Sequence, residues 1–151
     1  AISLGMRVIA NDPLIERDDK IWAKTGVQPY DLQHLLGQSD VVSVHTPLTD
    51  RTRNLIDNSA LRALKPGAML INTARGGIVD ERVLVELLRS GALDGAMLDV
   101  FETEPLPAGS RFKDVPNLIL TPHIAGVTEE SNVRVSTIVA TGVRRVLERS
   151  Q

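Results

Sequence analysis

Apolar runs of strand length alternate along the whole chain with segments in which apolar residues recur at helical spacing. Such alternation is typical of strands that lie parallel in a sheet and are joined by helices. Several runs are continuously apolar, as expected of strands covered on both faces. The expected strands are residues 7–11, a short one near Val27, 41–45, 68–72, 95–100 and 118–120. The pattern predicts an α/β fold with a doubly wound parallel sheet.

The helical segments are expected over residues 14–24, 31–36, 57–64, 80–90 and 128–148. Asp57 or Asn58 suits the N-cap of the third. The fourth has the clearest limits, since Asp80 suits an N-cap and Gly91 a C-terminal stop. The last spans roughly 30 Å at about 1.5 Å per residue, which is long enough to reach a neighbouring domain. One face of it carries Val135, Ile138, Val139 and Val146.

The composition excludes several classes of function. The 151 residues suffice for one domain with a core and are too few for two ordinary ones. A net charge of -2 gives no basic field to attract nucleic acid or an acidic membrane. Cysteine is absent, which excludes disulfides, thiolate metal sites and cysteine nucleophiles and fits a reducing compartment. No stretch approaches the roughly 20 apolar residues of a membrane helix, so we expect a soluble cytoplasmic protein without a metal.

Residues able to contact a ligand follow or close most of the expected strands. In a doubly wound sheet, ligands bind beyond the carboxyl ends of the strands. The residues at such positions are Asp12, Thr46, Pro47, Thr73, Ala74, Arg75, Asp99 and His123. The sequence therefore predicts a binding site at this edge of the sheet.

Asp12 closes the first expected strand. In dinucleotide folds a carboxylate there accepts hydrogen bonds from the adenosine ribose hydroxyls and repels a 2′-phosphate, which favours NAD over NADP. Arg17 and Lys20 lie close enough in sequence to leave NADP open as the less favoured cofactor. A turn or N-cap aspartate before proline is the structural alternative.

Thr46 and Pro47 break the strand over residues 41–45. Their loop is placed to lie over a cofactor, with the Thr46 hydroxyl offered to it and Pro47 packed on an apolar ring. A turn punctuated by proline explains the pair equally well. His45 fits a structural histidine better than an acid or base.

Arg75 follows an apolar strand and precedes Gly76 and Gly77. Glycines let backbone or ligand approach closely, and a guanidinium in such a place suits a fork-shaped donor aimed at a carboxylate. A structural ion pair is the alternative. Two further segments place Glu104 in a loop after the strand that ends at Asp99, and His123 after the last strand. A histidine and a carboxylate at one sheet edge can form an oriented acid-base pair.

Taken together, these segments resemble the D-2-hydroxyacid dehydrogenase family. The match covers nearly the whole chain in order, and its most specific parts are Asn72-Thr73-Ala74-Arg75-Gly76-Gly77-Ile78-Val79-Asp80-Glu81, Leu98-Asp99-Val100-Phe101-Glu102-Thr103-Glu104-Pro105 and Thr121-Pro122-His123-Ile124-Ala125-Gly126. The resemblance implies a Rossmann-like NAD-binding domain of an enzyme that interconverts D-2-hydroxy acids and 2-oxo acids by hydride transfer.

The resemblance also implies a role for individual residues. Arg75 would hold the substrate carboxylate and carbonyl, His123 would be the general acid-base, and Glu104 would hydrogen-bond its imidazole. The glutamate argues against formate as the substrate, because formate dehydrogenases carry glutamine there. On the cofactor side, the implied contacts are Asp12 at the ribose, Thr46, Pro47, Thr73 and Ala74 along the dinucleotide, Asp99 at the carboxamide, and Ala125 and Gly126 beside the nicotinamide ring.

The sequence departs from the family at its front. Gly5-Met6-Arg7-Val8 matches the segment that comes after the first helix of the family's domain, so the first strand and its G-x-G-x-x-G turn, which binds the pyrophosphate, are not among the 151 residues. We expect a fragment: residues 1–127 as a truncated core and 128–151 as a helix returning to a substrate domain. We expect the full-length enzyme to be a homodimer and this fragment to be inactive.

A second class of function shares these motifs. Some relatives of the family act as NAD-sensing transcriptional corepressors without catalysis, and they can keep all three reactive residues. The sequence thus leaves a non-catalytic NAD-binding module as the alternative to a dehydrogenase.

Overall fold

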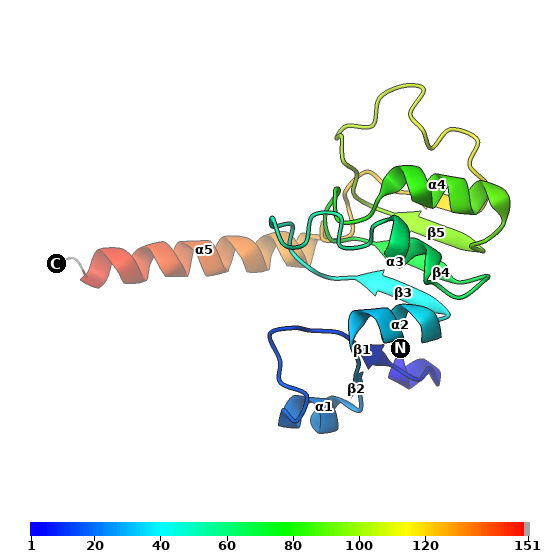
Figure 1. Cartoon of the computed structure of the whole chain (residues 1–151). Helices are drawn as coiled ribbons and strands as arrows, with labels where there is room; N and C mark the ends of the chain where they lie inside the picture. Colours follow the sequence, from blue (N-terminus) through cyan, green and yellow to red (C-terminus); the bar gives the residue numbers. More distant parts are fainter. Residues whose placement is uncertain (150–151) are drawn as a thin grey trace.

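The computed structural model describes residues 1–149, and its elements alternate in the order that the sequence predicts. In chain order they are the 3-10 helix η1 (Ile2–Leu4), β1 (Ile9–Ala10), α1 (Lys20–Thr25), β2 (Gln28–Pro29), α2 (Leu32–Gln38), β3 (Val41–Val44), α3 (Asn58–Arg62), β4 (Met69–Asn72), α4 (Glu81–Ser90), β5 (Gly95–Leu98), β6 (Leu118–Leu120) and α5 (Glu129–Arg149). This order, shown in Figure 1, confirms the α/β class.

The strands form two parallel sheets. β3, β4, β5 and β6 pair in that order, whereas β1 pairs only with β2. Val44 lies beside Asn72, and Asn72 beside Leu98, so the carboxyl ends of β3, β4 and β5 are level at one edge. Within residues 1–149, β3 pairs only with β4, so β3 is an edge strand of the larger sheet. The parallel pairing in both sheets confirms the parallel arrangement that the sequence predicts.

Three helices cover one face of the four-stranded sheet. α2 contacts α3 and α3 contacts α4, and Figure 1 shows α3 and α4 against β4 and β5. The apolar stripe of α4 is buried in the core, at Val83, Leu84, Leu87 and Leu88. Burying one such side chain stabilises the fold by about 1.5–3 kcal/mol. α4 is therefore firmly anchored to the sheet.

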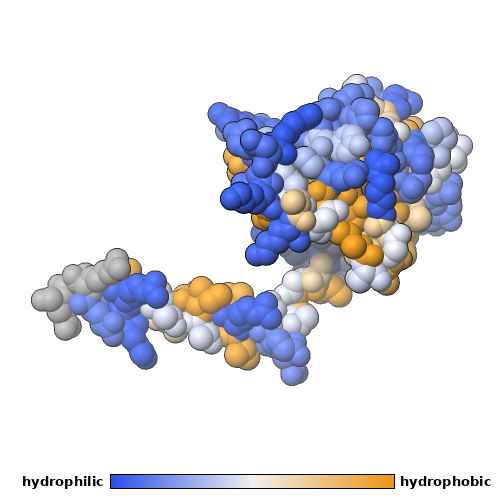
Figure 2. All heavy atoms as spheres, turned by 90° about the horizontal axis from the view of Figure 1, so that it is seen from below, coloured by the Kyte–Doolittle hydropathy of each residue, from blue (hydrophilic) through white to orange (hydrophobic). Residues whose placement is uncertain are grey.

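The opposite face of the sheet is partly exposed, so the expectation that the strands are covered on both faces is wrong for this chain. Met69 is 47% exposed and Ile119 is 61% exposed, because α2, α3 and α4 pack on the other side. α5 extends away from the sheets and exposes its apolar residues (Figures 1 and 2). In residues 1–149 no helix has both the length and the apolar character needed to cross a membrane.

The predicted ends of the helices are partly confirmed. Asp80 caps α4, Gly91 ends it in the left-handed conformation, and Asp57 rather than Asn58 caps α3. The predicted helix over residues 14–24 is wrong in its first half, since α1 begins only at Lys20. The Asp19 side chain accepts a hydrogen bond from the Ile21 amide and starts the helix there. Aspartate bonded to its own backbone favours caps and turns over helix interiors.

Candidate active site

The segments after β3, β4, β5 and β6 lie at the carboxyl edge of the larger sheet, because these strands are parallel and in register. Thr46, Arg75, Asp99 and His123 belong to these segments. Asp12 follows β1 in the smaller sheet. The fold thus gathers most of the sequence-predicted site at one sheet edge.

His123 and Glu104 are in direct contact. Nδ1 of His123 lies 2.8 Å from Oε2 of Glu104, and Oε1 of the same carboxylate accepts a hydrogen bond from the Phe101 amide at 2.9 Å. An ionised carboxylate can only accept, so Nδ1 carries the proton of this contact. The hydrogen bond from His123, followed by that from Phe101, lowers the pKa of Glu104. The carboxylate therefore stays ionised, and Nε2 is the ring nitrogen left for a ligand.

Asp99 holds the loop that carries His123 and is itself fully buried. Its Oδ1 accepts from the Thr121 hydroxyl at 2.5 Å and from the Ile124 amide at 2.9 Å, and its Oδ2 accepts from the Ala125 amide at 2.9 Å. Burial by itself raises the pKa of Asp99, but these hydrogen bonds outweigh burial and the pKa is lowered. His123, with φ of 56°, sits in the middle of this clamped loop.

We expect Asp99→Asn to lower the free energy of unfolding by about 1–3 kcal/mol, because an amide NH2 would face a backbone N–H that needs an acceptor. The lowered pKa of Asp99 stabilises the fold above the ordinary aspartate range, and that stabilisation is lost as the pH falls through the folded-state pKa. Urea unfolding at neutral and acid pH should therefore show a flatter acid limb for Asp99→Asn. Asp50→Asn, at an exposed position, is the control. Equal stability of the two variants would contradict the role of Asp99 in holding the loop that carries His123.

Arg75 is exposed at the end of a turn that Asn72 shapes. The buried Asn72 side chain donates to the Arg75 carbonyl at 3.0 Å and accepts from the Ala74 amide at 3.0 Å. The guanidinium donates to the Ala74 carbonyl at 2.6 Å. No carboxylate of residues 1–149 lies within ion-pair distance of it. The alternative of a structural ion pair is thus absent from the described chain, and the guanidinium's charge is left for an anionic ligand.

Gly76 brings the Arg75 turn against the loop that carries Glu104. A Cβ atom at Gly76 would lie 1.9 Å from the Phe101 carbonyl oxygen and 2.6 Å from the Glu102 nitrogen, far inside contact distance. The close approach that the sequence predicts for this glycine is therefore an approach of backbone to backbone. This close packing of backbone keeps the segment that bears Arg75 next to the segment that bears Glu104.

The residues predicted to hold a dinucleotide fit a polar ligand. The Thr46 hydroxyl oxygen is buried and has no hydrogen-bond partner among the described residues. A buried hydroxyl without a partner costs free energy, which a ligand's polar group can recover. Thr73 and Ala74 are half-buried, and Pro47, Ala125 and Gly126 are exposed. Among residues 1–149 no cluster of His, Cys, Asp and Glu is suited to a metal ion.

Asp12 takes part in a local turn, as the structural alternative for this residue expects. Its Oδ1 accepts from the Leu14 amide at 2.9 Å. It also lines a cavity of about 220 Å³ beside the ends of β1 and β2, together with Arg17, Trp22 and Tyr30. The turn and a ribose contact are compatible, because the turn uses only Oδ1 of the carboxylate.

Three residues of the site lie outside the sequence-based predictions. Asn72 shapes the Arg75 turn, Thr121 bonds Asp99, and the buried Glu81 bonds the Glu102 amide at 2.6 Å. Asn72 carries a recognisable signal, since a polar residue ends an otherwise apolar strand. Glu81 reads as an ordinary residue of a first helical turn, and its burial depends on contacts distant in sequence.

The chain is similar in sequence to a known family and to known proteins. Residues 1–125 match the family described as "D-isomer specific 2-hydroxyacid dehydrogenase, NAD binding domain". The chain is 56% identical to an (S)-sulfolactate dehydrogenase of Chromohalobacter salexigens over 95% of its own length and 46% of that protein.

Two solved structures share the fold. D-lactate dehydrogenase of Aquifex aeolicus, complexed with NAD and lactic acid, matches 97% of this chain and 48% of its own at 31% identity with a TM-score of 0.84. A D-isomer specific 2-hydroxyacid dehydrogenase of Xanthobacter autotrophicus, in complex with NADPH and MES, matches 95% of this chain and 58% of its own at 34% identity with a TM-score of 0.82. The chain thus spans about half the length of these relatives, and it belongs to the D-isomer specific 2-hydroxyacid dehydrogenase family.

Proposed function

We propose that the full-length protein, meaning this chain within a sequence of its relatives' length, transfers hydride between NAD and a D-2-hydroxy acid or its 2-oxo acid. The observation that carries the proposal is the contact of 2.8 Å between His123 Nδ1 and Glu104 Oε2. It lies at the carboxyl edge of the sheet, where doubly wound folds bind their ligands. An imidazole oriented by a carboxylate is the arrangement expected of a general acid-base.

In the reducing direction, NADH supplies the hydride that reaches the carbonyl carbon of the 2-oxo acid. Protonated His123 gives a proton from Nε2 to the carbonyl oxygen as charge develops there. The Glu104 carboxylate stabilises the imidazolium and fixes its orientation. Arg75 holds the substrate carboxylate and draws charge from the carbonyl, which aligns the reacting atoms. In the oxidising direction His123 takes the proton from the hydroxyl.

NAD is the proposed cofactor, with Thr46, Pro47, Thr73 and Ala74 along the dinucleotide and Ala125 and Gly126 beside the ring. Asp99 is fully buried and bonded to the loop that carries His123, so it would support that loop instead of contacting the carboxamide. Asp12 would bind the ribose. Arg17, which would favour a 2′-phosphate, already lies 3.6 Å from the Asp31 carboxylate. Both side chains of this pair are largely exposed, so the pair is weak. The preference for NAD therefore rests on the Asp12 carboxylate, and solved relatives contain either nucleotide.

We expect the 151-residue chain by itself to bind NADH more weakly than micromolar. Its sequence contains no G-x-G-x-x-G segment, so it lacks the backbone amides that hold a pyrophosphate at a helix N-terminus. Isothermal titration of the chain and of the full-length protein measures the difference. Micromolar affinity of the chain alone would show that the glycine turn is dispensable.

Glu104→Gln in the full-length protein should move the pH optimum for 2-oxo acid reduction to lower pH. The amide carries no charge opposite the ring that gives up the proton, so the reduction would require a more acid solution. Initial rates across the pH range measure the shift, with Glu86→Gln on the exposed face of α4 as the matched control. An unchanged pH profile for Glu104→Gln would contradict the pairing.

The substrate belongs to the small 2-hydroxy acids, and sulfolactate is a candidate because a relative of that name is 56% identical. A homodimer and a cytoplasmic location stay predictions of the sequence.

A further inference from the structure

We propose that Glu81 is a positioning residue: its buried carboxylate fixes the turn over residues 101–104 and so delivers Glu104 to His123. The role rests on the proposed function, in which Glu104 orients the acid-base. Glu81 itself touches neither of these side chains. It acts through the backbone of the turn.

Glu81 is the first residue of α4 and only 5% exposed. A carboxylate is rarely buried to this degree unless it is paired. Its Oε1 accepts the Glu102 amide at 2.6 Å, a link between residues 21 positions apart. Hydrogen bonds to ionised groups are stronger than neutral ones, so this bond is well suited to hold a turn.

The turn that Glu81 holds carries Glu104, whose carboxylate orients His123. The neighbouring amide in the chain, that of Phe101, donates to Oε1 of Glu104, whose Oε2 contacts His123. Gly76 closes the turn from the other side, because any Cβ there would collide with the Phe101 carbonyl. The Glu102 amide and the Phe101 amide are adjacent, so a turn released from Glu81 no longer presents the Phe101 amide to Glu104.

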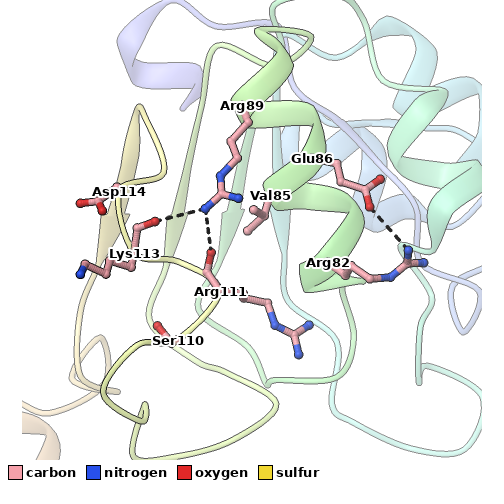
Figure 3. Close-up of a pocket in the computed structure, with 8 residues that line it drawn as sticks. All are labelled: Arg82, Val85, Glu86, Arg89, Ser110, Arg111, Lys113 and Asp114. Atoms are coloured by element: carbon pink, nitrogen blue, oxygen red, sulfur yellow. Dashed lines mark hydrogen bonds and ion pairs between the residues drawn. The ribbon is translucent and has the colours of Figure 1, made fainter.

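The remainder of the loop is fastened to the same helix at its far end, as Figure 3 shows. Arg89 near the end of α4 donates to the carbonyl oxygens of Lys113 and Arg111, at 3.2 and 3.5 Å. Phe101 and Phe112 pack together in the core with ring centroids 5.6 Å apart. The contacts of Arg89 border a depression of about 480 Å³ between α4 and residues 110–114. α4 thus holds the loop at both ends. Of these attachments, the bond between Glu81 and the Glu102 amide is the one nearest to Glu104 along the loop.

The charges around Glu81 agree with a structural bond rather than a ligand contact. The pKa of Glu81 is raised, chiefly because burial disfavours its ionised form. The Glu102 amide opposes this rise, the Glu102 carboxylate adds to it, and Arg111 and Asp80 contribute smaller opposed effects. Arg111 lies 3.6 Å from the Glu102 carboxylate and so is shared between the two glutamates. The Glu102 amide is therefore the main contact that stabilises the ionised carboxylate against the cost of its burial.

The test uses Glu81→Met, which keeps the side-chain length and helix propensity but removes the acceptor, and Glu81→Gln, which keeps an acceptor oxygen. Carbon-detected NMR titration of the Glu104 carboxyl group in this chain is the first readout. The pKa of Glu104 is lowered in the wild type by its bonds with His123 and Phe101. We expect Glu81→Met to return it toward the ordinary glutamate range and Glu81→Gln to keep most of the lowering.

Amide hydrogen exchange is the second readout. We expect the Phe101 amide to lose roughly 10- to 100-fold of its protection in Glu81→Met, the loss that corresponds to a hydrogen bond with a charged group. Glu86→Gln, a neutralisation on the exposed side of α4, should alter neither readout. If Glu81→Met folds and its Glu104 has the same pKa as in the wild type, the proposal is overturned.

If Glu81→Met does not fold, amide hydrogen exchange of the wild-type chain tests the proposal instead. The Glu102 and Phe101 amides should then show the same protection factor, because one opening releases both. A Phe101 amide that exchanges much faster than that of Glu102 would overturn the coupling. None of these readouts requires turnover, so they separate this proposal from the proposed function. In the full-length protein, Glu81→Met should lower kcat with little change in the KM for NADH.

Discussion

His123→Gln in the full-length protein is expected to lower kcat/KM for 2-oxo acid reduction by roughly 10²–10⁴, the usual contribution of a general acid-base. Glutamine is of similar size and can still donate a hydrogen bond, but it cannot give up a proton in the transition state. The hydroxyl product would then have to take its proton from water. Initial rates of NADH oxidation at saturating and limiting 2-oxo acid measure both kcat and kcat/KM.

The chain offers a matched control for this variant. His45 also follows a strand at the carboxyl edge and is exposed, but its Nε2 lies 2.9 Å from the Ser43 hydroxyl and has no carboxylate partner in residues 1–149. His45→Gln should leave the rate within about twofold of the wild type, because His45 has no carboxylate in the described chain to orient it as an acid-base. Equal losses for His45→Gln and His123→Gln, or no loss for either, would contradict the role of His123.

Gly76→Ala is expected to lower the free energy of unfolding by about 3 kcal/mol or more, at the upper end of overpacking effects. The added methyl group would lie 1.9 Å from the Phe101 carbonyl oxygen, and that atom belongs to backbone that cannot rotate away. The turn must therefore move, which separates the Phe101 amide from Glu104. Urea unfolding gives the loss of stability, and the NMR titration of Glu104 gives the loss of its lowered pKa.

Gly142→Ala is the control for that substitution. Gly142 lies inside α5, and a Cβ atom there meets nothing within 4 Å. Alanine exceeds glycine in helix propensity by about 1 kcal/mol, so this variant should not be destabilised. A stable Gly76→Ala variant with an unchanged Glu104 titration would show that the contact between the two turns is not required.

The parts of the fold set by neighbouring residues could be predicted from the sequence. Asp80 and Gly91 delimit α4 because capping depends on a few adjacent backbone groups. The strands at 68–72 and 118–120 follow from apolar runs. The prediction of a helix over the whole of residues 14–24 was wrong because of equally local bonds. The side chains of Asp12 and Asp19 accept hydrogen bonds from nearby backbone amides, and the residues before Lys20 form turns.

The sequence could indicate candidate functional residues, but it could not indicate the residues that hold them in position. The sequence indicated Arg75, Glu104 and His123 as candidates because ordered motifs place them after strands. Glu81 and Thr121 were missed because their roles depend on partners 21 and 22 positions away in the sequence. The buried, unpartnered hydroxyl of Thr46 likewise depends on residues brought together only by the fold. The turn role of Asp12, by contrast, was one of the two alternatives that the sequence offered.

The central claim is that Arg75, Glu104 and His123 serve hydride transfer to a 2-oxo acid. The most direct test follows NADH absorbance while the full-length protein is given glyoxylate, hydroxypyruvate, phosphohydroxypyruvate and sulfopyruvate in turn. We expect turnover of at least one of them, and its loss in His123→Gln. Tight NADH binding without turnover of any 2-oxo acid would contradict the claim and favour a non-catalytic NAD-sensing module.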